Sequence, residues 1–160
     1  ALDLALNHAD RVASVTAICS AGLGPEINMV YIDGFMAAKR RKQLQPVLEM
    51  LVADPQMVSR EMIEDVLRFK RLDGAEAALN RIVDDTFAGG QQALQLTDRL
   101  GEIRAPVQVI WGKKDRIIPP RHAEGLPAGI RVHLLDGAGH MAHMEKAAEV
   151  NELIKAFVGG

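Results

Sequence analysis

An aspartate and a histidine on two loops near the end of the chain could supply two of the three groups of a catalytic triad. Asp115 ends the segment Trp111–Asp115 (WGKKD), and His140 ends the segment Asp136–His140 (DGAGH). Each segment follows an apolar run that is typical of a buried strand. A carboxylate can orient an imidazole, which can then take a proton from a hydroxyl or thiol and return it to a leaving group. The order Asp and then His matches the end of a Ser…Asp…His sequence.

Each residue also has a purely structural interpretation. Asp115 precedes the segment Ile117–Pro120, which leads into a helix, so the same position suits a helix N-cap or a turn aspartate. The structural alternative for His140 is an ordinary loop histidine. The sequence leaves these alternatives open, although the pair favours acid–base chemistry more strongly than either residue does alone.

A metal site is a third interpretation of the segment around His140. His140, His143 and Glu145 are all ligand types, and they lie close together in the sequence. Their spacing does not match the helical His-Glu-x-x-His arrangement, and Cys19 is far away along the chain. We therefore expect no metal.

The nucleophile that an Asp–His pair would serve is not evident in these 160 residues. The usual frame, Gly-x-Ser-x-Gly, does not occur. Ser14 is predicted in a strand, Ser59 at a helix start, and Ser20 before a glycine-containing loop without the required glycine frame. Cys19 has no basic cluster beside it in the sequence to lower its pKa, which favours a role as a small buried residue.

Three predicted strands would carry the two loops. Residues 11–19, 107–111 and 131–135 are rich in β-branched and apolar side chains. A short helix is expected at 121–125, and a longer one with an apolar face begins at about Glu145. This alternation predicts a parallel α/β sheet, in which ligands bind at the carboxyl ends of the strands, where both loops lie.

Residues 26–100 contain no convincing strand and predict a compact helical insertion. One helix is expected from Tyr31 to Gln43, and Pro46 is expected in the first turn of the next. Ser59 is a predicted N-cap of a third helix. Asp73 and Glu76 resemble a capping box, which would open a fourth helix that extends to Phe87.

Composition narrows the class of protein and its partners. A hydrophobic content of 48% and a charged content of 25% are ordinary for one globular domain. The net charge of −2 gives no reason to expect binding to nucleic acid or to an acidic membrane, and no apolar run is long enough to span a bilayer. A single cysteine is compatible with a reducing compartment, so we expect the cytoplasm.

The first residues already follow helical spacing, with apolar side chains at Leu2, Ala5, Leu6 and Ala9. Because no Met or N-cap residue precedes them, we expect the chain to be cut from something longer.

Several segments together resemble the C-terminal part of an α/β-hydrolase: Ala9–Val12 before a strand, Gly112–Pro119, and Gly139–His140 followed by Glu145 and then Val150–Asn151. The resemblance implies that Asp115 is the triad acid and His140 the triad base. It implies a fold of about three parallel strands with flanking helices and an all-helical cap. The early strands, the oxyanion loop and the nucleophile turn of the family would all precede Ala1.

The same resemblance divides the chain into three parts. Residues 1–25 would be a core helix and strand, residues 26–100 the helical cap, and residues 101–160 the core strands and helices with the acid and histidine loops.

A narrower resemblance covers nearly the whole chain, including the cap. The segments that carry it are Ala21–Asn28, Tyr31–Phe35, Phe69–Gly74 and Trp111–Gly112. They resemble the hydrolase-like domain of dihydrolipoamide acetyltransferase components of acetoin dehydrogenase complexes. This implies an acyltransferase that passes a small acyl group, acetyl, from lipoamide on a separate domain to coenzyme A. The other components of the dehydrogenase complex would be its partners, and no metal would take part.

Two other functions remain open. An α/β-hydrolase that cleaves an ester or a carbon–carbon bond would use the same Asp115 and His140. An inert fragment that serves packing or assembly would use neither.

Without a nucleophile we expect residues 1–160 alone to show little or no activity. With an uncovered sheet edge we expect self-association or pairing with the missing N-terminal half. The remaining histidines, predicted at the surface or at helix ends, are His8, His122 and His133.

Overall fold

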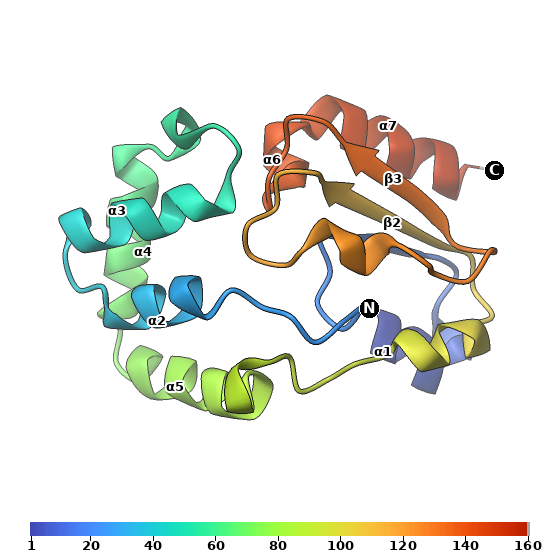
Figure 1. Cartoon of the computed structure of the whole chain (residues 1–160), viewed down its shortest axis with the longest axis horizontal. Helices are drawn as coiled ribbons and strands as arrows, with labels where there is room; N and C mark the ends of the chain where they lie inside the picture. The colour runs from blue at the N-terminus through green and yellow to red at the C-terminus, as the bar shows by residue number, and fades with distance from the viewer. Residues whose placement is uncertain (160) are drawn as a thin grey trace.

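A parallel sheet forms the centre of the molecule. The computed structural model describes residues 1–159, and within them three strands pair in the order β1-β2-β3: β1 (Val15–Ile18), β2 (Val107–Gly112) and β3 (Arg131–Leu135) (Figure 1). The central strand β2 is buried at all six of its positions, as expected for a strand with neighbours on both sides. The predicted parallel α/β architecture is confirmed.

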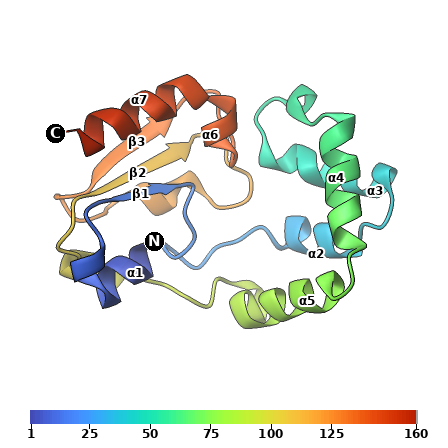
Figure 2. The same ribbon diagram turned by 180° about the vertical axis from the view of Figure 1, so that it is seen from behind.

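Helices flank the sheet. In both views α7 (Ala147–Val158) is drawn above the strands and α1 (Leu2–Asn7) below them, and α6 (Ala142–Glu145) lies beside the ends of β2 and β3 (Figures 1 and 2). The short 3-10 helices of this part are η1 (Ala9–Arg11), η5 (Thr97–Glu102) and η6 (Pro120–Ala123). The main apolar core lies between these helices and the strands, and Val109, Ile110 and Trp111 at its centre are fully buried.

The segment between β1 and β2 is helical and lies beside the sheet (Figure 1, blue to yellow-green). It contains α2 (Met29–Ala37), α3 (Arg41–Leu48), α4 (Arg60–Lys70) and α5 (Ala75–Thr86), with the short η2 (Glu49–Leu51), η3 (Pro55–Met57) and η4 (Ala88–Gly90). It has a small apolar cluster of its own, made of Ala38, Leu44, Leu48, Ile63 and Leu67. The expected helical insertion is therefore present.

Two predicted details of the helical segment are wrong at its start. The single helix predicted from Tyr31 to Gln43 is divided, because Ala38 and Arg40 adopt extended backbone between α2 and α3. This turn lets Ala38 join the buried cluster. Pro46 lies inside α3 rather than in a first turn, so one helical hydrogen bond is given up there.

The start signals of the next two helices differ in outcome. Ser59 is the N-cap of α4, since its side chain accepts a hydrogen bond from the Met62 amide at 3.1 Å. The capping box of Asp73 and Glu76 is wrong. Gly74 is the N-cap of α5 and has a φ of +80°, a left-handed conformation that glycine adopts without strain.

The core elements follow their predictions closely. The strand predicted at 131–135 is confirmed. The strand predicted at 11–19 is shorter, because only Val15–Ile18 finds partners on β2, in register with Val107–Ile110. Gly160, the last residue of the predicted 101–160 part, lies outside the described residues. Across residues 1–159, none of the helices combines the length and apolarity that crossing a membrane requires.

Candidate catalytic site

Asp115 stands just past the carboxyl end of β2, and its carboxylate is held by neighbours in its own sequence. Oδ1 accepts hydrogen bonds from the amides of Ile117 (2.8 Å) and Ile118 (3.0 Å). Oδ2 accepts one from the indole Nε1 of Trp111 at 3.0 Å. The turn interpretation of Asp115 is therefore correct for one oxygen, whereas the N-cap interpretation is wrong, because the next helix begins only at Pro120.

His140 meets the other side of this carboxylate. Its Nδ1 lies 2.9 Å from Oδ2 of Asp115, and the Asp115 side chain is fully buried while that of His140 is 22% exposed. A carboxylate only accepts hydrogen bonds, so in the neutral imidazole the proton sits on Nδ1 and Nε2 keeps the lone pair. The arrangement gives an imidazole that is oriented by a buried carboxylate and that can accept a proton at Nε2.

The two loops meet because β2 and β3 end at the same level, with Gly112 opposite Leu135. Beyond the strands, the Lys114 amide donates to the Ala138 carbonyl at 2.9 Å. A Cβ at Gly112 would overlap the carbonyl groups of Ala138 and Gly139, so the two loops can approach this closely only with glycine there. The short glycine-containing segments noted in the sequence have this physical cause.

Cys19 is the third polar side chain at this place. It follows β1, has a φ of +45°, and its thiol donates to the Gly139 carbonyl at 3.7 Å. Its Sγ and the nearest ligand atoms of Asp115 and His140 all lie within 4.8 Å of one another. Burial raises the pKa of the Cys19 thiol to about 12, so it stays protonated at neutral pH and is a weak nucleophile and a weak metal ligand.

Glu145, considered in the sequence as a metal ligand type, has both oxygens engaged by backbone amides. Oε1 accepts from Ala53 and Oε2 from Gly139, each at 2.6 Å. Its neighbour His143 is exposed. This role of Glu145 does not follow from the sequence around it, because Ala53 lies 92 positions away.

Two further contacts join the helical segment to the aspartate loop. The Asn28 side chain caps α2 by accepting from the amides of Val30 and Tyr31, and it donates to the Arg116 carbonyl at 2.7 Å. The guanidinium of Arg116 donates to the Glu49 carbonyl and also to that of Val52. Neither role follows from local sequence pattern.

His122 lies in the last turn of η6, one of the two places predicted for it, but it is buried rather than at the surface. Its ring Nε2 pairs with Glu26, which also accepts from Arg121 at 2.7 Å. These two hydrogen bonds, chiefly the one from Arg121, lower the pKa of the Glu26 carboxyl to about 2. The ring of His122 meets the edge of Trp111, with 6.3 Å between ring centroids. His8 is exposed as predicted, and His133 is half-buried.

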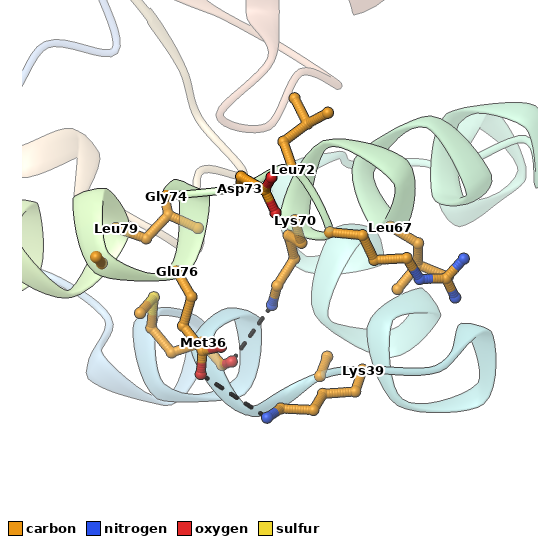
Figure 3. Close-up of a pocket in the computed structure, with 12 residues that line it drawn as sticks. Met36, Lys39, Leu67, Lys70, Leu72, Asp73, Gly74, Glu76 and Leu79 are labelled. Carbon is orange, nitrogen blue, oxygen red and sulfur yellow. Dashed lines mark hydrogen bonds and ion pairs between the residues drawn. The ribbon is translucent and has the colours of Figure 1, made fainter.

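A cavity of about 600 Å³ lies within the helical segment, and neither Asp115 nor His140 lines it (Figure 3). Lys70 points into it and donates to the carbonyls of Phe35 and Met36 at the end of α2. The Lys70 ammonium also lies 4.6 Å from the centre of the Phe35 ring, and desolvation lowers its pKa. Two of the segments that carried the narrower resemblance, Tyr31–Phe35 and Phe69–Gly74, thus meet in space. A second cavity of about 460 Å³ lies beside Asp115, where Val52 and Lys114 contribute to its wall.

The chain is similar in sequence to proteins of known family. A sequence model of the alpha/beta hydrolase fold matches residues 1–147. The dihydrolipoyllysine-residue acetyltransferase component of the acetoin cleaving system of Cupriavidus necator is 44% identical over 160 residues. That alignment covers 100% of this chain and 43% of the relative, so the chain spans less than half the length of that protein.

More distant similarities point to hydrolases. The 2-hydroxy-6-oxo-6-phenylhexa-2,4-dienoate hydrolase of Comamonas testosteroni is 25% identical over 168 residues, covering 99% of this chain and 58% of the relative. Among solved structures, the meta-cleavage product hydrolase of Pseudomonas fluorescens IP01 superposes with a TM-score of 0.84 at 17% identity. The superposition covers 99% of this chain and 60% of the hydrolase chain. At this low identity the similarity is one of fold.

Proposed function

Because this chain belongs to the α/β-hydrolase fold family, we propose that Asp115 and His140 are the acid and the base of a catalytic triad. The observation that carries the proposal is the 2.9 Å contact between Nδ1 of His140 and Oδ2 of the buried Asp115. The nucleophile would be a serine outside residues 1–160. The overall reaction would be transfer of an acetyl group from lipoamide to coenzyme A, as implied by the 44% identity to an acetoin-cleaving acetyltransferase component.

The proposed reaction consists of two successive acyl transfers. In the first, Nε2 of His140 takes the proton of the serine hydroxyl, whose oxygen attacks the thioester carbonyl. The lipoamide sulfur leaves with that proton, and an acetyl ester remains. In the second, Nε2 takes the proton of the coenzyme A thiol, whose sulfur attacks the ester. The serine oxygen then recovers the proton. Asp115 stabilises the imidazolium that forms in each transfer.

We also propose a division of labour within the chain. Residues 1–25 and 101–160 would form the catalytic core, and residues 26–100 a cap over the acyl site. The separate apolar cluster of the helical segment supports this division. Other components of an acetoin-cleaving system would be partners of the full-length protein, and its place would be the cytoplasm.

A second candidate is a hydrolase that cleaves an ester or a carbon–carbon bond. The 25% identity to a 2-hydroxy-6-oxo-6-phenylhexa-2,4-dienoate hydrolase favours it. It would use the same two side chains but would pass the acyl group to water. An inert assembly fragment is the third candidate. It applies to residues 1–160 in isolation, for which we expect little or no activity and self-association in size-exclusion chromatography.

The test compares two histidine variants of the full-length protein with acetyl-dihydrolipoamide and coenzyme A as substrates. We expect His140→Ala to lower the rate of acetyl-coenzyme A formation by roughly 10⁴-fold, as for loss of a triad member. The matched control is His143→Ala, which removes an exposed histidine three residues away and should leave the rate unchanged. Full activity of His140→Ala would overturn the proposal. Ester hydrolysis that needs no coenzyme A would favour the second candidate.

A further inference from the structure

Glu145 joins two parts of the molecule that are far apart in the sequence. It ends α6, and its two carboxylate oxygens each accept a 2.6 Å hydrogen bond from a different backbone amide. One amide belongs to Ala53 in the helical segment. The other belongs to Gly139, the residue before His140. A single carboxylate therefore bridges the helical segment and the histidine loop.

The chain around Ala53 lies directly against that loop. The Met141 amide donates to the Leu51 carbonyl at 3.0 Å. A Cβ at Gly139 would come within 2.9 Å of the Ala53 nitrogen and 3.0 Å of the Leu51 oxygen, a separation too short for any other residue. Residues 49–53, which we call the contact segment, thus touch the backbone on both sides of His140.

The contact segment also reaches the aspartate loop. Arg116, next to Asp115, donates to the carbonyls of Glu49 and Val52 within it. One short segment of the proposed cap is therefore held by a residue adjacent to the acid and by the residues that flank the base. A shift of this segment would change the support of the two loops unequally, because Asp115 has its own local hydrogen bonds and His140 has one, to Asp115.

We propose that Glu145 is a positioning residue that couples the contact segment to His140, so that Nδ1 faces Asp115 only while the segment is seated. The proposal rests on the function proposed above, because it concerns the same acid–base pair. A carboxylate is required at this position, since two N–H donors face it and charge-assisted hydrogen bonds are the stronger kind. An amide has one acceptor oxygen, so glutamine would leave one of the two N–H groups facing another donor.

The first experiment measures hydrogen exchange by mass spectrometry on the full-length protein. In Glu145→Gln and Glu145→Ala we expect exchange in the peptides that carry the Ala53 and Gly139 amides to rise roughly tenfold or more. The matched control is Glu152→Gln, which removes an exposed glutamate paired with Lys155 on α7 and should leave both peptides unchanged. The conservative glutamine variant keeps the test valid if the alanine variant folds poorly. Unchanged exchange at Ala53 would overturn the coupling.

The second experiment reads the histidine itself, without any substrate, and so separates this proposal from the proposed function. Nitrogen-15 NMR of labelled histidine distinguishes the two neutral tautomers. The wild-type protein should show His140 protonated at Nδ1, and the Glu145 variants should show a second tautomer or averaged signals. A Glu145→Gln protein with faster exchange at both amides and an unaltered His140 tautomer would reduce Glu145 to a structural contact and overturn the positioning role.

Arg116→Ala approaches the contact segment from the aspartate loop. With Glu145 present, loosening the segment should also raise exchange at Gly139. In the Glu145→Gln background the Arg116→Ala substitution should add little at Gly139, because the connection is already broken. Equal increments in the two backgrounds would contradict coupling through Glu145.

Discussion

The loop that carries Asp115 and the loop that carries His140 are held in different ways. In the aspartate loop, residues 112–118, three of the four N–H groups that bond to the carboxylate come from residues within four positions of Asp115. In the histidine loop, residues 136–141, the supports come from far away: Ala53 through Glu145, Leu51 by its carbonyl, and Cys19 by its thiol. Asp115 is therefore positioned mainly by residues next to it in the sequence, whereas the loop of His140 is positioned by residues that only the fold brings near.

The largest expected effect comes from the point where the two loops touch. In Gly112→Ala the new Cβ would overlap the carbonyl groups of Ala138 and Gly139, which are backbone and cannot rotate away. We expect the free energy of unfolding to fall by about 3 kcal/mol, the upper end for overpacking, measured by urea denaturation. The displaced loop should also separate His140 from Asp115.

Gly101→Ala is the matched control for this substitution. A Cβ at Gly101 meets no atom within 4 Å, so the change in stability should stay within about 0.5 kcal/mol. If Gly112→Ala proved as mild as Gly101→Ala, the two loops would be more adaptable than their contact indicates, and the contrast between them would lose its physical basis.

The difference between the loops also explains what the sequence could predict. The strands, the placing of Asp115 and His140 at neighbouring strand ends, and the turn role of Asp115 depend on residues close together in the chain, and these were predictable. The contacts of Glu145 with Ala53, of Arg116 with Glu49 and of His122 with Glu26 join residues 67 to 96 positions apart. No local pattern encodes them, so the burial of His122 and the bridging role of Glu145 were not foreseen.

The helical segment shows the same limit. Ser59 is a local N-cap and was identified, whereas the break between α2 and α3 arises because Ala38 turns inward to join Leu44 and Leu48. Gly74 starts α5 in place of the predicted capping box, since the left-handed turn after α4 favours glycine there over an aspartate cap. In both places tertiary packing and chain reversal outweigh local preference.

Trp111→Phe tests how far the aspartate loop supports itself. The substitution keeps a buried aromatic ring but removes the Nε1–H that donates to Oδ2 of Asp115 at 3.0 Å and to the Ile118 carbonyl at 3.3 Å. We expect a loss of about 2 kcal/mol of stability, typical of a lost hydrogen bond to a charged group, measured by thermal and urea denaturation.

The structure also predicts where the effect of Trp111→Phe should stop. The amides of Ile117 and Ile118 still hold Oδ1, so the loop should keep its turn, and their hydrogen exchange should remain slow. Rapid exchange at both amides would mean that the indole organises the whole loop. The aspartate loop would then depend on one anchor, much as we propose the histidine loop depends on Glu145.

The smallest expected effect concerns η6, which continues the aspartate loop and pairs with the distant residue Glu26. Glu26 pairs with Arg121 and His122 in η6, and these partners, Arg121 first, lower its pKa from 4.5 to about 2. A carboxyl whose pKa is lowered in the folded state stabilises the fold at pH values above its pKa in the unfolded chain. This contribution is lost as the pH falls from about 4.5 towards 2.

In Glu26→Gln the melting temperature should therefore be slightly below that of the wild type at pH 6, and the melting temperatures of the two proteins should converge near pH 2. Arg121→Gln should weaken the same acid dependence by removing the main cause of the shift. A constant difference between wild type and Glu26→Gln from pH 6 to pH 2 would show that the Glu26 contacts act by packing rather than by charge.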